Sequence, residues 1–248
     1  MSYPDPRHLI CALGADLATL VAAANSFRGA SIAFTVDDNY SSDEADDRMD
    51  RSFGVCWDRV HPNAWTDADE EAVSSHGAVM YALSPSLERA DAAAAAADAV
   101  RFAVHLLDHG AVAVKGESAG IAHGAVRWHQ LATELEASTG LARDRVARLA
   151  MTKRPLGGDG YYESLGNHLV GLPEVYVAKV VGLTERGAVK LLDDIADELA
   201  AGVDVIAKYD ATLDPTSPYE GGFEFKINPY GIIRVPTRSP LLPARVGI

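Results

Sequence analysis

A serine between small residues is the feature of this sequence whose spacing points most directly to chemistry. The segment Gly116-Glu117-Ser118-Ala119-Gly120 has the G-x-S-x-G pattern, which presents a nucleophilic serine on a sharp turn between a strand and a helix. Small flanking residues permit that turn, and the helix N-terminus with backbone N–H groups would stabilise an oxyanion. An apolar segment, residues 111–115, precedes the motif, and we expect a helix after it. The pattern therefore predicts acyl transfer with Ser118 as the nucleophile.

The same pattern resembles the nucleophile elbow of serine esterases of the α/β-hydrolase fold, in which an acid and then a histidine follow the serine on later strands. The two histidines next in the chain fall on the helix expected directly after the turn, which leaves His168 as the base. A serine hydrolase using Ser118, His168 and Glu117 is therefore an alternative function. The competing interpretation is structural, with Ser118 as the N-cap of the helix.

Histidine and glutamate side chains in the same regions suggest a second alternative, a metal-dependent enzyme. His123 and His168, with Glu174 or Glu117, carry the nitrogen and oxygen ligands that transition metals accept. Their spacing matches no local metal-binding motif. We therefore expect no bound metal and no other cofactor.

Negative charge is concentrated near the N-terminus. The chain has 248 residues, with 22 basic and 35 acidic side chains and a net charge of −13. Residues 37–76 hold twelve acids against three arginines, a balance of −9. Such a chain is a poor candidate for binding nucleic acid or an anionic membrane. We expect a docking surface for a basic partner protein, with candidate binding residues Asp43, Glu44, Asp46, Asp47, His123 and Glu174.

Hydrophobic patterning in the first third predicts an α+β fold with mixed or antiparallel sheets and helices packed on one face. The expected order is β-α-β-β-α-β, which is that of a ferredoxin-like unit. Its strands are expected at 8–13, 31–36, 54–60 and 77–83, and its helices at 16–27 and 66–75.

The remainder of the chain continues the mixture of helices and strands. Helices are expected at 85–109 and 184–201, and strands at 145–152, within 161–181, at 203–209, 223–227 and 232–235. We interpret the chain as one domain of residues 1–248, with two fused subdomains, 1–140 and 141–248, as the alternative organisation.

Three short segments resemble the bacterial family called domain of unknown function 4261. They are Leu106-Leu107-Asp108-His109-Gly110-Ala111-Val112-Ala113-Val114, then Ser118-Ala119-Gly120-Ile121-Ala122-His123, and Gly171-Leu172-Pro173-Glu174-Val175. The similarity extends over about residues 30–210. The chain departs from it at Lys115-Gly116-Glu117, where an aromatic residue and an amide are expected. The resemblance implies an α+β fold and no established activity.

The incomplete catalytic sets and the clustered charge together favour a binding function over an enzyme. No basic segment followed by an apolar run opens the chain, so we expect no signal peptide and a cytoplasmic location. The leading hypothesis is a non-enzymatic accessory protein, for example an immunity-like factor, that binds a protein partner with a basic surface. We expect no nucleic-acid or membrane binding, and the sequence leaves the oligomeric state open.

Overall fold

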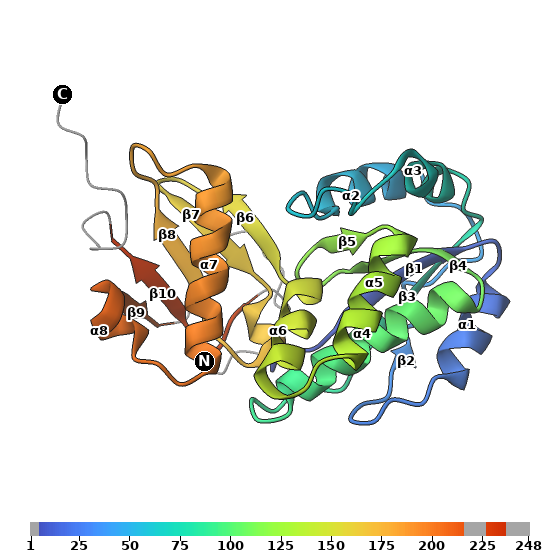
Figure 1. Cartoon of the computed structure of the whole chain (residues 1–248). Coiled ribbons are helices and arrows are strands. Elements are labelled where there is room, and N and C mark those ends of the chain that lie inside the picture. The colour runs from blue at the N-terminus through green and yellow to red at the C-terminus, as the bar shows by residue number, and fades with distance from the viewer. Residues whose placement is uncertain (1–4, 216–226, 237–248) are drawn as a thin grey trace.

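Two five-stranded β-sheets with helices packed against them organise the chain (Figure 1), as the predicted α+β class requires. The computed structural model describes residues 5–215 and 227–236. The first sheet contains β1 (Leu9–Gly14), β2 (Thr35–Val36), β3 (Ala78–Leu83), β4 (Ala111–Gly116) and β5 (Ile121–His123). The second contains β6 (Lys153–Gly157), β7 (Tyr161–Leu165), β8 (Glu174–Ala178), β9 (Thr212–Asp214) and β10 (Ile232–Val235).

The first sheet has the strand order β2-β3-β1-β4-β5, and every pair of neighbours is antiparallel. Along the chain β1, helix α1 (Leu17–Ser26), β2, β3, helix α4 (Ala92–Asp108) and β4 follow the order β-α-β-β-α-β, with two helices inserted between β2 and β3. This β-α-β-β-α-β unit therefore ends at β4, whereas the sequence predicted that it ends with the strand at 77–83. Cys11 of the central strand β1 pairs with Tyr81 of β3 on one side and with Lys115 of β4 on the other. These three side chains therefore lie on one face of the sheet.

Helices cover both faces of this sheet, whereas the sequence predicted helices on one face. The inserted helices are α2 (Arg48–Cys56) and α3 (Asp67–Ser74). The segment 54–60 was expected to be a strand, but its first residues complete α2. Met49, Phe53 and Cys56 are four and three residues apart, so they share one helical face, and all three pack on Cys11 and its neighbours.

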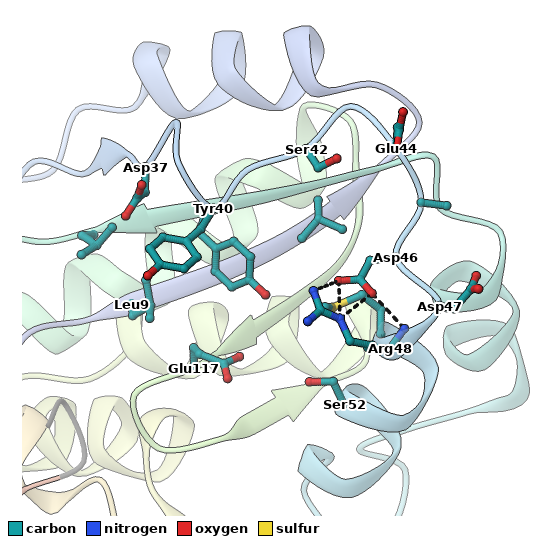
Figure 2. A pocket seen from close by; sticks show the side chains of 15 residues that line it. Leu9, Asp37, Tyr40, Ser42, Glu44, Asp46, Asp47, Arg48, Ser52 and Glu117 are labelled. Atoms are coloured by element: carbon teal, nitrogen blue, oxygen red, sulfur yellow. Dashed lines mark hydrogen bonds and ion pairs between the residues drawn. The ribbon is translucent and has the colours of Figure 1, made fainter. Parts of the chain in front are cut away.

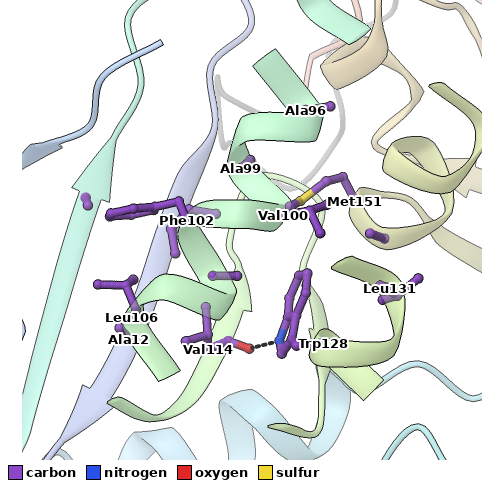
Figure 3. Packing of buried hydrophobic residues seen from close by; sticks show 14 of the residues in the cluster. Ala12, Ala96, Ala99, Val100, Phe102, Leu106, Val114, Trp128, Leu131 and Met151 are labelled. Carbon is purple, nitrogen blue, oxygen red and sulfur yellow. Dashed lines mark hydrogen bonds between the residues drawn. The ribbon is translucent and has the colours of Figure 1, made fainter. Parts of the chain in front are cut away.

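The opposite face of the sheet carries the main apolar core (Figure 3). Helix α4 runs across it beside α5 (Ala125–Glu136) and α6 (Gly140–Met151). The buried alanines of α4, among them Ala96 and Ala99, allow α6 to pack closely against it. Trp128 is fully buried, and its indole N–H donates to the Val114 carbonyl at 3.0 Å.

The second sheet has the order β6-β7-β8-β10-β9, with β8 and β10 parallel and the other neighbours antiparallel. Helix α7 (Glu185–Ala200) packs Leu192 and Ile195 against Val175 and Val177 of β8. A short 3-10 helix, η1 (Asn167–Val170), joins β7 to β8, and α8 (Val205–Tyr209) follows α7.

The structure confirms strands within 161–181, the helix at 184–201 and the strand at 232–235. Two other predicted strands are helical in the structure. The segment 145–152, expected as a strand, lies in α6 up to Met151, and residues 203–209 contain α8. Asp204 accepts the Ala207 N–H at 3.1 Å and so starts α8. The strand expected at 223–227 lies almost wholly outside the described residues.

Candidate functional site

A cavity of about 1020 Å³ opens on the α2 side of the first sheet (Figure 2). Its size suits a ligand or an inserted peptide segment. Five carboxylates and one guanidinium line it together with apolar and aromatic side chains. The lining residues are Leu9, Asp37, Tyr40, Ser42, Glu44, Ala45, Asp46, Asp47, Arg48, Met49, Ser52, Val79, Tyr81, Leu83 and Glu117.

Strand β3 supplies the apolar and aromatic floor of this pocket. Val79, Tyr81 and Leu83 alternate with residues that face the main core, so all three point to the pocket side. Tyr40, on the connection after β2, is 74% exposed at the rim. Sequence reasoning did not select these two tyrosines, although the two-residue alternation in 79–83 was a readable signal for Tyr81.

A buried lysine supports the base of the pocket. Lys115 is 1% exposed, its Nζ donates to Ser52 Oγ at 2.5 Å, and it lies 2.6 Å from Glu117 Oε2. Burial acts to lower the pKa of Lys115, but Cys11 and Glu117 outweigh burial, so that its pKa is raised overall. The ammonium therefore stays charged and fixes the partly exposed Glu117 carboxylate at the pocket base.

Asp46 and Arg48 form an ion pair on the pocket wall (Figure 2). The Arg48 guanidinium donates from Nε to Asp46 Oδ1 at 2.9 Å and from Nη2 to Oδ2 at 2.7 Å. These hydrogen bonds from Arg48 lower the pKa of Asp46 to about 2. The backbone N–H of Asp46 donates to His76 Nε2 at 3.0 Å, which ties this wall to the connection between α3 and β3.

The predicted acidic surface divides into two groups in the structure. Glu44, Asp46 and Asp47 line the pocket. Asp43 instead accepts the Leu17 N–H at 2.8 Å, at the start of α1. Asp69 completes the capping box of α3, so it too stabilises a helix end.

Ser118 lies in a turn between two strands, not before a helix. The turn joins β4 to β5, and α5 begins only at Ala125. The buried hydroxyl donates to the Arg7 carbonyl at 2.7 Å and accepts the Leu9 N–H at 2.9 Å. The expected strand-to-helix context is therefore wrong, and so is the N-cap interpretation. The Ser118 hydroxyl thus provides hydrogen-bond partners for the backbone of Arg7 and Leu9, where the chain enters β1.

The remaining predicted residues lie in separate places, and His123, His168 and Glu174 are buried. His168 Nδ1 and Glu174 Oε1 are 3.1 Å apart, and Glu174 also accepts Ser164 Oγ at 2.7 Å. His123 Nε2 instead bonds the Ala150 carbonyl at 3.0 Å. Glu117 faces the acidic pocket. The structure thus joins one pair of the proposed metal ligands and separates the others. Within residues 5–215 and 227–236, no group of three or more His, Cys, Asp or Glu could hold a metal ion.

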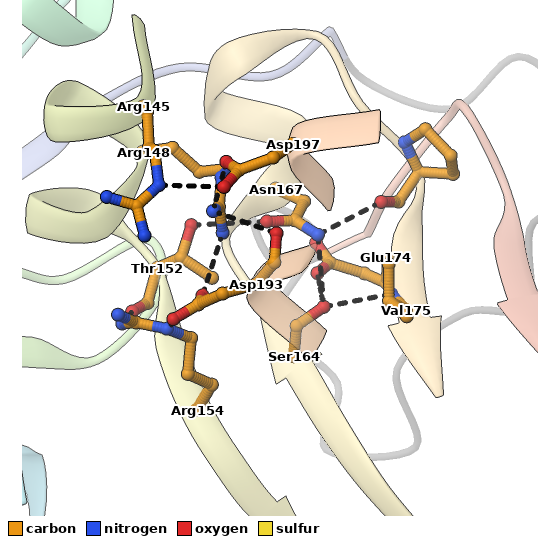
Figure 4. Close-up of polar contacts among 11 residues, drawn as sticks. Arg145, Arg148, Thr152, Arg154, Ser164, Asn167, Glu174, Val175, Asp193 and Asp197 are labelled. Atoms are coloured by element: carbon orange, nitrogen blue, oxygen red, sulfur yellow. Dashed lines mark hydrogen bonds and ion pairs between the residues drawn. The ribbon is translucent and has the colours of Figure 1, made fainter. Parts of the chain in front are cut away.

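Residues 141–154 carry five basic side chains against one acid, and three of the arginines form ion pairs with α7 (Figure 4). Arg148 donates to Asp193 at 3.1 Å and to Asp197 at 2.9 Å, and Arg154 donates to Asp193 at 2.6 Å. Arg145 also reaches Asp197, at 2.7 Å. These guanidinium groups hold α6 and the start of β6 against α7.

No family model, no curated protein and no solved structure matches this chain. The resemblance to domain of unknown function 4261 therefore stays a prediction. Among the described residues, no helix combines the length and apolar character needed to cross a bilayer.

Proposed function

We propose that this chain is a non-enzymatic protein-binding factor whose acidic pocket receives a basic segment of a partner protein. One observation carries the proposal: a cavity of about 1020 Å³ combines five carboxylates and one guanidinium with an aromatic and apolar floor. An accessory or immunity-like role in the cytoplasm is the cellular context that we propose for this binding.

The physical basis is complementarity of both charge and shape. Clustered carboxylates attract and orient a basic partner before contact, which raises the association rate. Long basic side chains can lay their methylene stems on apolar surface while the charge meets a carboxylate. Val79 and Leu83 offer that surface, and the exposed Tyr40 offers an aromatic anchor of the kind enriched at interface hot spots.

Fluorescence anisotropy with a labelled peptide of alternating glycine and arginine tests this proposal. The double variant Glu44→Gln/Asp47→Asn removes two pocket charges and should weaken binding by about three- to tenfold. Glu70→Gln/Glu71→Gln is the matched control, because it removes two exposed charges from α3 outside the pocket lining. Absence of binding, or equal weakening in both variants, would refute the proposal.

The geometry offers less to the hydrolase alternative. The Ser118 hydroxyl already bonds backbone groups on both sides of His8. Ser118 and His168 are also absent from the lining of the acidic pocket. We therefore propose no hydrolytic function.

A further inference from the structure

The acidic pocket already contains a guanidinium, that of Arg48. It meets Asp46 side-on, in the two-pronged arrangement that matches a planar fork of N–H donors to a carboxylate. Figure 2 shows this pair on the wall of the pocket, where Tyr40 and Glu117 also lie. Because the wall accommodates a guanidinium from its own chain, it provides a direct template for one from a partner.

Arg48 is held weakly enough to be replaced. Its side chain is 86% exposed, and its hydrogen bonds to side chains all go to Asp46 within the described residues. Water and salt reach this exposed guanidinium and screen its attraction to Asp46. By contrast, the Asp46 carboxylate is fixed, because it also accepts the Arg48 backbone N–H at 3.0 Å at the start of α2.

The rest of the pocket suits a guanidinium better than an ammonium. Tyr81 on the floor and Tyr40 at the rim offer aromatic surface, on which a planar guanidinium stacks. Glu117 places a second carboxylate at the base, oriented by the buried Lys115. A lysine ammonium is a compact, strongly hydrated charge and cannot reproduce the two parallel hydrogen bonds to one carboxylate.

We infer that the pocket selects an arginine side chain of the partner, and that Arg48 is the resident group that this arginine replaces at Asp46. The inference rests on the proposed function and names its partner chemistry. It also assigns Arg48 a regulatory role, since the resident guanidinium competes with the incoming one and limits affinity.

Two labelled peptides, of alternating glycine and arginine or of alternating glycine and lysine, test the selection by anisotropy at equal ionic strength. The arginine peptide should bind at least about fivefold more tightly, since bidentate carboxylate pairing is lost with lysine. Methylguanidinium should displace the arginine peptide at lower concentrations than methylammonium. If both peptides bind equally, this inference fails while the proposed function survives; if neither binds, both fail.

Variants of α2 test the replacement itself. Arg48→Ala should tighten binding of the arginine peptide by about three- to tenfold, because it frees Asp46 and removes one positive charge. Arg51→Ala removes the same charge from an exposed position of the same helix outside the pocket lining, so it measures the charge effect alone. Equal gains in the two variants would overturn the role of Arg48.

Asp46→Asn provides the complementary measurement. It should abolish the preference for arginine over lysine, because an amide presents one acceptor and one donor to the guanidinium fork. Circular dichroism would establish that α2 persists in this variant. If the preference for arginine persists in a folded Asp46→Asn protein, Asp46 does not bind the partner arginine. If this variant unfolds, the comparison of Arg48→Ala with Arg51→Ala tests the binding of the partner arginine at Asp46 instead.

Discussion

At the scale of single residues, neighbours decide what a side chain does. Ser118 occurs in a sequence that predicts a nucleophile, but its hydroxyl both donates to and accepts from backbone groups of the residues that flank His8. The Ser118 proton is donated to a backbone carbonyl, so the hydroxyl lacks the adjacent base that nucleophilic catalysis requires.

We therefore expect no labelling of the wild-type chain by a fluorophosphonate probe. Ser118→Ala should instead lower the free energy of unfolding by about 1–3 kcal/mol, since it leaves a buried N–H and a buried carbonyl without partners. Urea denaturation measures the loss. Labelling that disappears in Ser118→Ala would reinstate the hydrolase alternative.

Glu174 illustrates the same principle in the second half of the chain. Its buried carboxylate accepts the Ser164 hydroxyl, the Gly166 N–H and the Asn228 amide, at 2.7, 3.0 and 3.1 Å. Burial acts to raise the pKa of Glu174, but His168 and these hydrogen bonds outweigh it, so that the pKa is lowered.

Glu174→Gln should destabilise the fold by about 2–3 kcal/mol, because its amide turns a donor toward groups that are donors themselves. Urea melts at pH 7 measure this. Because the pKa of Glu174 is lowered, the extra stability of the wild type over Glu174→Gln is fully present above the pKa of an unfolded glutamate. This extra stability is lost as the pH falls through the pKa of Glu174 in the folded chain. An advantage that grew on acidification would contradict this assignment.

At the scale of elements, α6 and α7 show how charge is used inside the molecule. Asp193 is shared by Arg148 and Arg154, and all three side chains are largely buried. The next residue, Asp194, is paired with Lys190 at the surface. Two adjacent acids of one helix therefore have different energetic roles.

Asp193→Ala should cost about 3–5 kcal/mol, because it leaves the buried Arg154 guanidinium without a carboxylate and leaves Arg148 with Asp197 alone. Asp194→Ala is the matched control and should change stability by less than about 1 kcal/mol. Chemical denaturation of both variants distinguishes the two residues. Equal losses of stability in the two variants would show that the buried ion pairs of Asp193 contribute no more to stability than the surface pair of Asp194.

At the scale of the whole molecule, two buried histidines link stability to pH. Burial, with a smaller contribution from His168, lowers the pKa of His8 to about 3. Burial also lowers the pKa of His123 to about 4, against the opposing effect of Asp58. Neither His8 ring nitrogen has a hydrogen-bond partner among the described residues.

Because an unfolded histidine titrates near pH 6.5, the unfolded chain binds more protons below that pH than the folded chain does. Stability should therefore fall from about pH 6.5 toward pH 4, by up to about 1.4 kcal/mol per pH unit for each histidine. His8→Leu should flatten this dependence in urea melts at pH 7 and pH 5. His129→Gln should not, because Asp108 raises the pKa of the half-exposed His129. An unchanged slope in His8→Leu would contradict the assignment.

The sequence by itself determined the α+β class, the acidity of residues 37–76, and those elements whose local signals agree. Thr184, for example, caps α7 before a regular apolar stripe, and the structure has that helix. The sequence also placed Glu44, Asp46 and Asp47 together, because they lie within four consecutive residues of the chain. These features follow from local chemistry and periodicity.

Only the tertiary structure decided the rest. The segments 54–60 and 145–152 carry β-branched or mixed patterns that fit a strand, yet α2 and α6 form there because one helical face of each is buried against the first sheet or α4. Tyr81 and Glu117 line one pocket with the acids of residues 44–47 only because β3, β1 and β4 pair side by side. Contacts between residues distant in sequence depend on strand register and packing, which local patterns do not encode.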